Sequence, residues 1–171
     1  MIRLTLEGCE AWLSGNGLAG LDSLWQSNIR DSFVIPERAS ARTILARTLA
    51  GYLARSDGLF VLRETDVWNT DIPLVYSRLI APESTATALA VINETPGFNF
   101  APGDEELLVG ALALSMYFYW GFLCVSKDPV WWLCIDHDDV IRVCSPKPAG
   151  YEFDAEASFS PIGLMRLDPI K

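Results

Sequence analysis

The sequence predicts an α+β fold: a single domain over residues 1–171, with N-terminal helices packed on an antiparallel sheet and a C-terminal three-stranded meander. A chain of 171 residues is long enough for one domain with its own core. Half of the residues are apolar and a fifth are charged, which is typical of a folded protein. In the second half, short apolar runs alternate with compact polar turns, which favours antiparallel strands.

The first sixty residues predict two strands with two helices between them. Residues 2–6 alternate apolar and polar side chains, as a short strand does. The glycine-rich stretch 15–20 predicts a turn that leads into a helix over about 18–29. A second helix is expected over 40–55, with its first serine as the N-cap and the nearby arginines off its apolar stripe. The apolar run 59–62 predicts the next strand.

The middle of the chain is less regular. Residues 64–73 predict a loop, residues 74–80 a strand, and residues 82–92 fit a helix or a strand equally well. Residues 96–103 contain two prolines, two glycines and two phenylalanines, which predicts a loop. From Tyr151 onward the pattern is irregular, and no internal repeat or long linker divides the chain.

Residues 107–126 carry no charge, and this run is long enough for a membrane-spanning helix. The two halves of the run differ, however. The first half follows Pro102 and three acids and is rich in leucine and alanine, which favours a helix with acids in its first turn. The second half, from Tyr117, is rich in aromatic and β-branched residues, which favours a strand. We therefore expect a helix followed by a strand, and no membrane span.

That strand is expected to open a meander with the apolar runs 130–136 and 140–144. The pairing expected for the first hairpin sets Val125 opposite Val130, Phe122 opposite Leu133 and Trp120 opposite Ile135. In the second hairpin, a three-residue turn over 137–139 sets Ile135 opposite Ile141 and Leu133 opposite Val143. Asp139 tolerates the left-handed conformation that the last position of such a turn often needs. One face then becomes apolar throughout: Trp120, Phe122, Trp131, Leu133, Ile135, Ile141 and Val143.

The other face of the meander is a candidate binding surface. It is expected to carry Tyr117, Tyr119, Trp132, Cys134, Asp136, Arg142 and Cys144. Tyrosine, tryptophan and arginine are enriched at interaction hot spots. The sequence leaves open whether a helix or the C-terminal segment covers this face.

The acidic residues are concentrated in the second half of the chain. Residues 1–90 contain 8 basic and 10 acidic residues, a balance of −2, and residues 91–171 contain 5 and 12, a balance of −7. The total is the net charge of −9. Such a surface repels nucleic acid and anionic lipid and favours basic partners, although excess acid also serves solubility alone. We expect a protein partner and no nucleic acid.

The compartment and the metal content follow from the N-terminus and the cysteines. Residues 1–7 contain no apolar run of the kind that a secretory signal needs. The four cysteines form no closely spaced pair, and a single histidine is available to complete a zinc site. We therefore expect buried thiols in a reducing cytoplasm, with no metal and no cofactor.

Three further patterns are typical of reaction chemistry but fit ordinary structure better. The spacing of Gly15, Gly17 and Gly20 matches a dinucleotide-binding turn, but no buried strand precedes it and no βαβ unit follows. The cluster 136–139 contains metal-ligand residue types that hairpin turns also favour. His137, the single histidine, lies at a hairpin tip, where nothing excludes water from a reaction. We expect no catalytic residue.

Arginine outnumbers lysine 10 to 3 and makes the better bidentate contacts with phosphate. Four arginines lie in or near the helix expected over 40–55: Arg38, Arg42, Arg47 and Arg55. Because the whole chain is acidic, we expect them to pair with local acids or with the acidic second half.

A short acidic domain and the tryptophan-rich segment 119–139 together resemble a known class of proteins. In these features the chain resembles the small immunity proteins that bacteria make against their own antibacterial toxins. Many of those proteins share an α+β fold that ends in such a hairpin. The resemblance implies a non-enzymatic inhibitor that occludes a toxin's active site. It carries no role over to any particular residue, because no functional motif is shared.

The sequence therefore predicts a cytoplasmic immunity protein that neutralises a basic toxin. The contacts expected are side chains of the meander, namely Tyr117, Tyr119, Trp132, Asp136, Asp138, Asp139 and Arg142, and a second acidic patch formed by Asp104, Glu105 and Glu106. Two alternatives stay open: a small enzyme whose acidic site the spacing does not reveal, and an adaptor or structural subunit of a secretion or phage assembly. A deep acidic pocket would favour the enzyme, and an aromatic face buried in a homo-oligomer would favour the adaptor.

Overall fold

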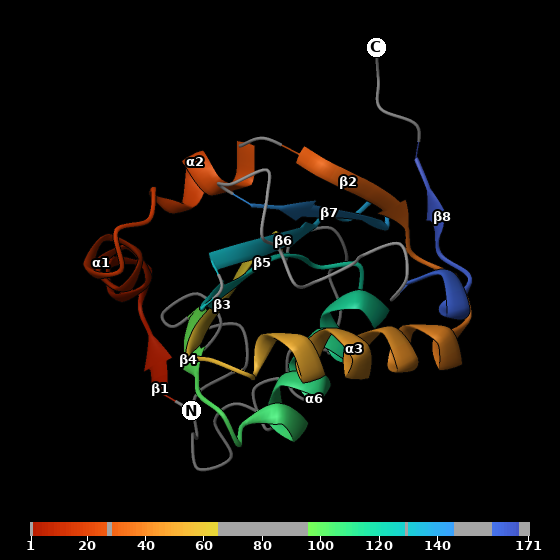
Figure 1. The fold of residues 1–171 in the computed structure, drawn as a ribbon, viewed down its shortest axis with the longest axis horizontal. Helices are drawn as coiled ribbons and strands as arrows, with labels where there is room; N and C mark the ends of the chain where they lie inside the picture. Colours follow the sequence, from red (N-terminus) through yellow and green to blue (C-terminus); the bar gives the residue numbers. More distant parts are fainter. Residues whose placement is uncertain (1, 27–28, 65–95, 129, 146–158, 168–171) are drawn as a thin grey trace.

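A computed structural model describes residues 2–26, 29–64, 96–128, 130–145 and 159–167. Its centre is an eight-stranded sheet in the order β1-β4-β3-β5-β6-β7-β2-β8, in which all neighbouring strands are antiparallel (Figure 1). The predicted α+β fold is confirmed. The strand expected over 74–80 and the element expected over 82–92 lie outside the described residues.

The strands are β1 (Ile2–Leu4), β2 (Ile29–Val34), β3 (Gly58–Glu64), β4 (Gly97–Phe100), β5 (Gly121–Lys127), β6 (Val130–Ile135), β7 (Val140–Cys144) and β8 (Met165–Arg166). The helices are α1 (Leu6–Gly15), α2 (Leu21–Gln26), α3 (Ala39–Leu53) and α6 (Glu105–Tyr117), and a short 3₁₀ helix, η1, spans Ser160–Ile162.

Helices cover both faces of the sheet. Figure 1 shows α3 and α6 next to one another along one face, and α1 and α2 on the opposite side. The core beneath α3 and α6 contains the aromatic side chains Phe60, Phe98, Phe122 and Trp131, each at most 2% exposed. A smaller core lies beneath α1 and α2 and contains Leu13, Leu24, Leu123 and Trp132. Each face of the sheet is therefore buried against its own pair of helices.

The uncharged run 107–126 divides into a helix and a strand as the sequence predicts, but the strand expected from Tyr117 begins only at Gly121, because Tyr117 still belongs to the helix. Its first half continues α6, and its second half forms most of β5. The acids Glu105 and Glu106 occupy the first turn of α6, where they interact favourably with the helix dipole. Within the described residues, every helix is too short or too polar to cross a membrane.

The second hairpin of the meander has the predicted register. Ile135 lies opposite Ile141 and Leu133 opposite Val143, and Asp139 adopts a left-handed φ of 59°. The first hairpin is paired differently, because Lys127 lies opposite Val130 and the whole register moves by two residues. Side chains alternate faces with a period of two, so this shift leaves the facing unchanged. All seven residues of the predicted apolar face are at most 3% exposed.

Several expectations for the first hundred residues are wrong. A helix, α1, begins at Leu6 directly after β1, where Thr5 caps it through a 3.1 Å contact from the Gly8 amide. The helix expected over 18–29 is only α2, and residue 29 already begins β2. The helix α3 has Arg38 and not Ser40 at its N-cap position. Residues 97–100, expected in a loop, form β4, because Phe98 and Phe100 pack into the core.

Candidate functional site

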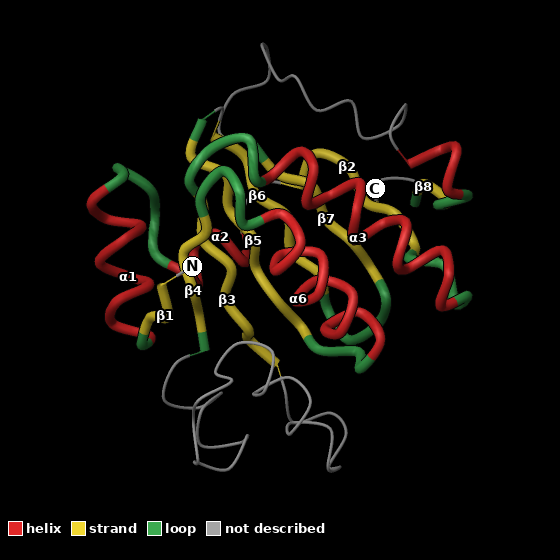
Figure 2. Tube along the Cα trace, turned by 90° about the horizontal axis from the view of Figure 1, so that it is seen from below, coloured by secondary structure: helices red, strands yellow, loops and turns green. Residues whose placement is uncertain are grey.

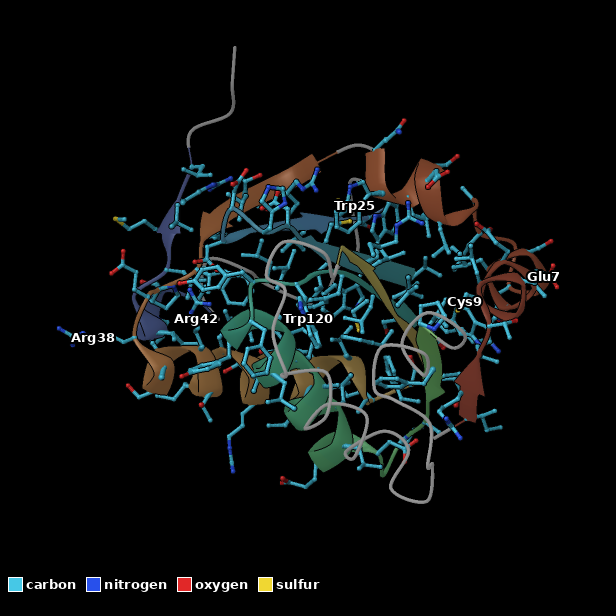
Figure 3. The ribbon with its side chains drawn as sticks, turned by 180° about the vertical axis from the view of Figure 1, so that it is seen from behind. Glu7, Cys9, Trp25, Arg38, Arg42 and Trp120 are labelled. Carbon is cyan, nitrogen blue, oxygen red and sulfur yellow. The ribbon has the colours of Figure 1, made fainter. Side chains whose placement is uncertain are left out.

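Arg42 is the one buried charged residue within the described part of the chain, with 3% of its surface exposed. The expectation that Arg42 lies off the apolar stripe of α3 is wrong. It precedes Leu45 by three positions and Leu49 by seven, so it lies on the same buried face of the helix. This spacing is the sequence signal that could have identified it. Figure 3 shows Arg42 pointing toward the interior, whereas Arg38 points away from the protein.

The guanidinium group of Arg42 connects three separate segments. Its Nε donates to the carbonyl of Pro36 at 3.0 Å, at the approach to α3. One terminal nitrogen donates to the carbonyl of Met116 at the end of α6, and the other to Asp139 Oδ2 at 2.5 Å in the β6–β7 turn. Two hydrogen bonds to carbonyl oxygens and one ion pair thus stabilise the positive charge of Arg42, which would be costly to bury without partners.

The fourth contact of Arg42 is aromatic. Its guanidinium carbon lies 4.7 Å from the centre of the Tyr119 ring, within the range of a cation–π interaction. Tyr119 follows α6 with a left-handed φ of 56°, and the amide of Trp120 donates to the carbonyl of Ser115 at 2.9 Å. This is a helix end at which glycine is usually preferred. A tyrosine is therefore held in a costly backbone conformation with its ring against a buried arginine.

Asp136 and Asp139 organise the β6–β7 turn. Asp136 Oδ1 accepts from the amides of Asp138 and Val140, both at 3.2 Å. The carbonyl of Asp139 accepts from the amide of Ile35 at 2.7 Å. The turn is thus fixed internally by one carboxylate and tied to the neighbouring segment through its last residue.

The electrostatic environment of Asp139 differs from that of an exposed carboxylate. Burial raises the pKa of Asp139 above its ordinary value, because the charged form loses solvation. Arg42 acts in the opposite direction through its charge and hydrogen bond, and Asp136 and Glu37 raise the pKa further. The net direction is upward, so the ion pair with Arg42 does not fully offset the loss of solvation.

Five of the predicted contact residues lie in the two segments that Arg42 joins, the end of α6 and the β6–β7 turn. We call this region the aromatic–acidic corner: Tyr117, Tyr119, Asp136, Asp138 and Asp139. Tyr117 is 58% exposed and Tyr119 is 37% exposed. The side chain of Asp138 is 78% exposed and that of His137, at the same hairpin tip, is 44% exposed. The corner therefore offers two aromatic rings and a negatively charged turn on a support fixed by Arg42.

Trp132 does not belong to the corner. The prediction of a single face that carries both tyrosines and Trp132 is wrong, because Tyr117 ends a helix on one side of the sheet and Trp132 lies on the other. Trp132 is 5% exposed, and its Nε1 donates to the carbonyl of Leu24 in α2 at 3.1 Å. The helix α2 thus covers this part of the sheet, which was one of the two possibilities that the sequence left open.

Arg142 is also on the α2 side of the sheet. Its guanidinium carbon lies 5.2 Å from the ring centre of Trp25, and one terminal nitrogen lies 3.6 Å from Asp136 Oδ2. Figure 3 shows Trp25 on the opposite side of the sheet from Arg42 and Trp120. Among the residues that the structure describes, Arg142 is therefore connected to the corner through Asp136.

The second acidic patch, Asp104, Glu105 and Glu106, begins the helix that Tyr117 ends. At 1.5 Å per residue, Glu105 and Tyr117 are about 18 Å apart along α6. Asp104 has a local role as well, because its Oδ2 accepts from the amide of Ala101 at 3.0 Å. The two predicted acidic regions thus lie at opposite ends of one helix.

The arginines of α3 have different surroundings. Arg42 pairs with Asp139, as the expectation of acidic partners requires, whereas Arg55 stacks on Tyr52 at 4.6 Å. Within the described residues, neither Arg38 nor Arg47 has an acidic partner. Of the four arginines expected to pair with acids, Arg42 is thus the one that does so within the described residues.

The glycine turn, the cysteines and the candidate metal ligands all lie where they serve the fold. The element before the glycine turn is the helix α1, which ends at Gly15, and not a buried strand. The turn leads into α2, where the amide of Leu21 donates to Glu10 Oε1 at 3.1 Å. All four cysteines are buried and unpaired by disulfides. Among the described residues, no group of three or more potential ligands is placed to hold a metal ion.

The fold and the corner together define a class only: an α+β protein with a rigidly held aromatic and acidic surface. Comparison of the chain with models of protein families, with curated proteins and with solved structures found no match.

Proposed function

We propose that this chain is a cytoplasmic binding protein without enzymatic activity, of the immunity-protein kind, which neutralises a basic toxin by occluding its active site. The observation that carries the proposal is the aromatic–acidic corner. Exposed tyrosine is a residue type enriched where binding energy concentrates, and the neighbouring carboxylates favour a basic partner.

The rigidity of the corner supports recognition. Tyr119 and Asp139 are both held in left-handed conformations, and both contact the buried guanidinium of Arg42. Side chains that are already ordered lose little conformational entropy when a partner binds. Backbone strain of this kind is concentrated at functional sites more than elsewhere. The corner is thus built at a cost to stability, which a binding role would explain.

The negative charge of the molecule supports a partner of positive charge. The net charge is −9, and most of the excess lies in the second half of the chain, which includes the β6–β7 turn. Long-range attraction between an acidic protein and a basic one raises the association rate and makes it depend on salt. A basic toxin would therefore be captured quickly at low ionic strength.

The proposal predicts that changes at the corner weaken the capture of a basic protein. Tagged wild type, the double variant Tyr119→Ala/Asp138→Lys and the control Glu7→Lys would be used to retain proteins from cells of the source organism. Wild type and Glu7→Lys should retain one basic protein, and the double variant should bind it at least about tenfold more weakly. Glu7 is an exposed acid on α1, away from the corner (Figure 3).

A second measurement tests the inhibitory role. The retained protein, purified, should lose its own activity when one equivalent of wild type is added and keep it with the double variant. An acidic partner, or a basic partner held equally well by the double variant, would remove the basis of the proposal.

A further inference from the structure

The outer surface of the α3 and α6 layer exposes several large apolar side chains. Figure 2 looks onto this layer, with α3 and α6 side by side in front of the strands. Leu107 and Tyr117 on α6 are 40% and 58% exposed, and Ile44 on α3 is 53% exposed. No charged residue occurs in α6 after Glu106. A helix this apolar is usually covered on more than one side.

The outward stripe of α3 carries positive charge only. Ile44, Arg47 and Gly51 are spaced three and four residues apart, and Arg55 follows one turn later, so these four exposed residues share one side. The helix contains no acidic residue. A β-carbon added at Gly51 would meet nothing within 4 Å, so the backbone there is open to close approach.

The two helices run in opposite directions, which places opposite charges at one end of the layer. Arg42 near the start of α3 contacts the carbonyl of Met116 at the end of α6. From this contact, Arg55, two residues past the end of α3, lies about 20 Å away in the direction of that helix, and Glu106 lies about 15 Å back along α6. Neither Arg55 nor Glu106 has an ion-pair partner among the described residues.

We propose that this layer is the interface of a homodimer in which α3 of each copy faces α6 of the other. The two-fold axis runs parallel to the helices, above the outer surface of the layer and midway between α3 and α6. It sets each α3 opposite the α6 of the second copy. Each residue keeps the same position along the direction of the axis. Arg55 of one copy then meets Glu106 of the other, and the same contact occurs twice. Both ion pairs lie at the same end of the layer, and the exposed apolar side chains of both helices continue from them along the interface.

The surface is self-complementary, as a two-fold interface requires. One end of the layer carries Arg55 beside α3 and Glu106 on α6, and rotation about the axis sets each of these charges opposite the other in the second copy. The ion pairs fix which helix faces which, and burial of Ile44, Leu107 and part of Tyr117 supplies the driving force. The proposal does not rest on the proposed function: the two surfaces share Tyr117, but Tyr119 and the β6–β7 turn do not belong to the layer.

The proposal predicts a charge-reversal rescue. Sedimentation equilibrium of wild type between about 1 and about 100 µM should give twice the monomer mass of 18.9 kDa at the upper concentrations. Arg55→Glu alone and Glu106→Arg alone should each weaken the dimer about tenfold or more, because each variant sets like charges together twice. An equimolar mixture of the two variants should dimerise as wild type does, since both contacts in the mixed dimer are again between opposite charges.

The control Glu7→Arg, made at an exposed position of α1, should leave dimerisation unchanged, and thermal unfolding should confirm that every variant is folded. A monomeric wild type over the whole concentration range would overturn the proposal. So would a dimer that either reversal leaves intact, or a mixture that stays monomeric. The double variant at Tyr119 and Asp138 should still dimerise, which separates this result from the test of partner binding.

Discussion

At the scale of single residues, Arg42 determines the geometry of the corner. It is 3% exposed. Its four contacts come from the segment before α3, the end of α6, the connection between α6 and β5, and the β6–β7 turn. A buried cation is expensive to desolvate, and the loss of any one partner leaves the remaining charge less well compensated. The free energies of unfolding of variants at Tyr119 and Asp139 therefore depend on backbone strain, on the solvation of the carboxylate and on its ion pair with Arg42.

Tyr119 should show two opposing contributions to stability. Tyr119→Ala removes the ring from Arg42 but keeps a side chain in the left-handed conformation, whereas Tyr119→Gly removes the ring and the strain together. We expect the glycine variant to be more stable than the alanine variant by about 1 kcal/mol in urea-induced unfolding. Equal stabilities would contradict the left-handed conformation at this position.

Asp139 should make stability depend on pH in an unusual direction. Its pKa is raised in the folded state above the ordinary 3.8, so the folded chain binds this proton more readily than the unfolded chain. The stabilising contribution is fully present below pH 3.8 and is lost as the pH rises through the raised pKa. Relative to Asp139→Asn, wild type should therefore become less stable as the pH rises from 3.8 through the raised pKa. Urea unfolding of both proteins at matched pH values measures this, and a difference that changes in the opposite direction would refute it.

At the scale of elements, the sequence predicts those whose pattern is strong and local. The split of the uncharged run into α6 and β5 follows from composition, and the second hairpin register follows from the need to keep Arg142 off the apolar face. The first register fails by two residues because both alignments bury the same side chains, so hydrophobicity cannot distinguish them. The strand β4 was missed because Pro96, Gly97 and Gly103 are turn residues, whereas tertiary packing of Phe98 and Phe100 overrides that local preference.

Gly97 provides a test at this scale, because it lets α1 approach β4. A β-carbon at Gly97 would lie 2.4 Å from Cys9 Sγ and 3.1 Å from the carbonyl of Phe60. Gly97→Ala should destabilise the protein by about 1–3 kcal/mol through overpacking, and Cys9→Ala in the same chain should recover part of that loss. Chemical unfolding gives the values. The control Gly15→Ala has nothing within 4 Å and should be close to neutral.

At the scale of the whole molecule, the sequence predicts the composition of the site better than its assembly. Tyr117, Tyr119 and the acids of the β6–β7 turn do lie in the segments that form the corner, but the residue that joins these segments, Arg42, is 97 positions from Asp139. Spacing within one element cannot reveal such a contact. Nor does the sequence state which face of the sheet α2 covers, and that is why Trp132 was expected at the surface and is buried.

The long separation between Arg42 and Asp139 has a consequence for how the chain matures. Contacts between residues far apart in sequence require the closure of a long loop, and they tend to form late. A chain still emerging from the ribosome contains Arg42 long before it contains Asp139, so the corner cannot be complete until synthesis has passed Asp139. A partner that recognises the corner would thus ignore nascent chains that do not yet include Asp139, and partly folded chains in which Asp139 has not reached Arg42.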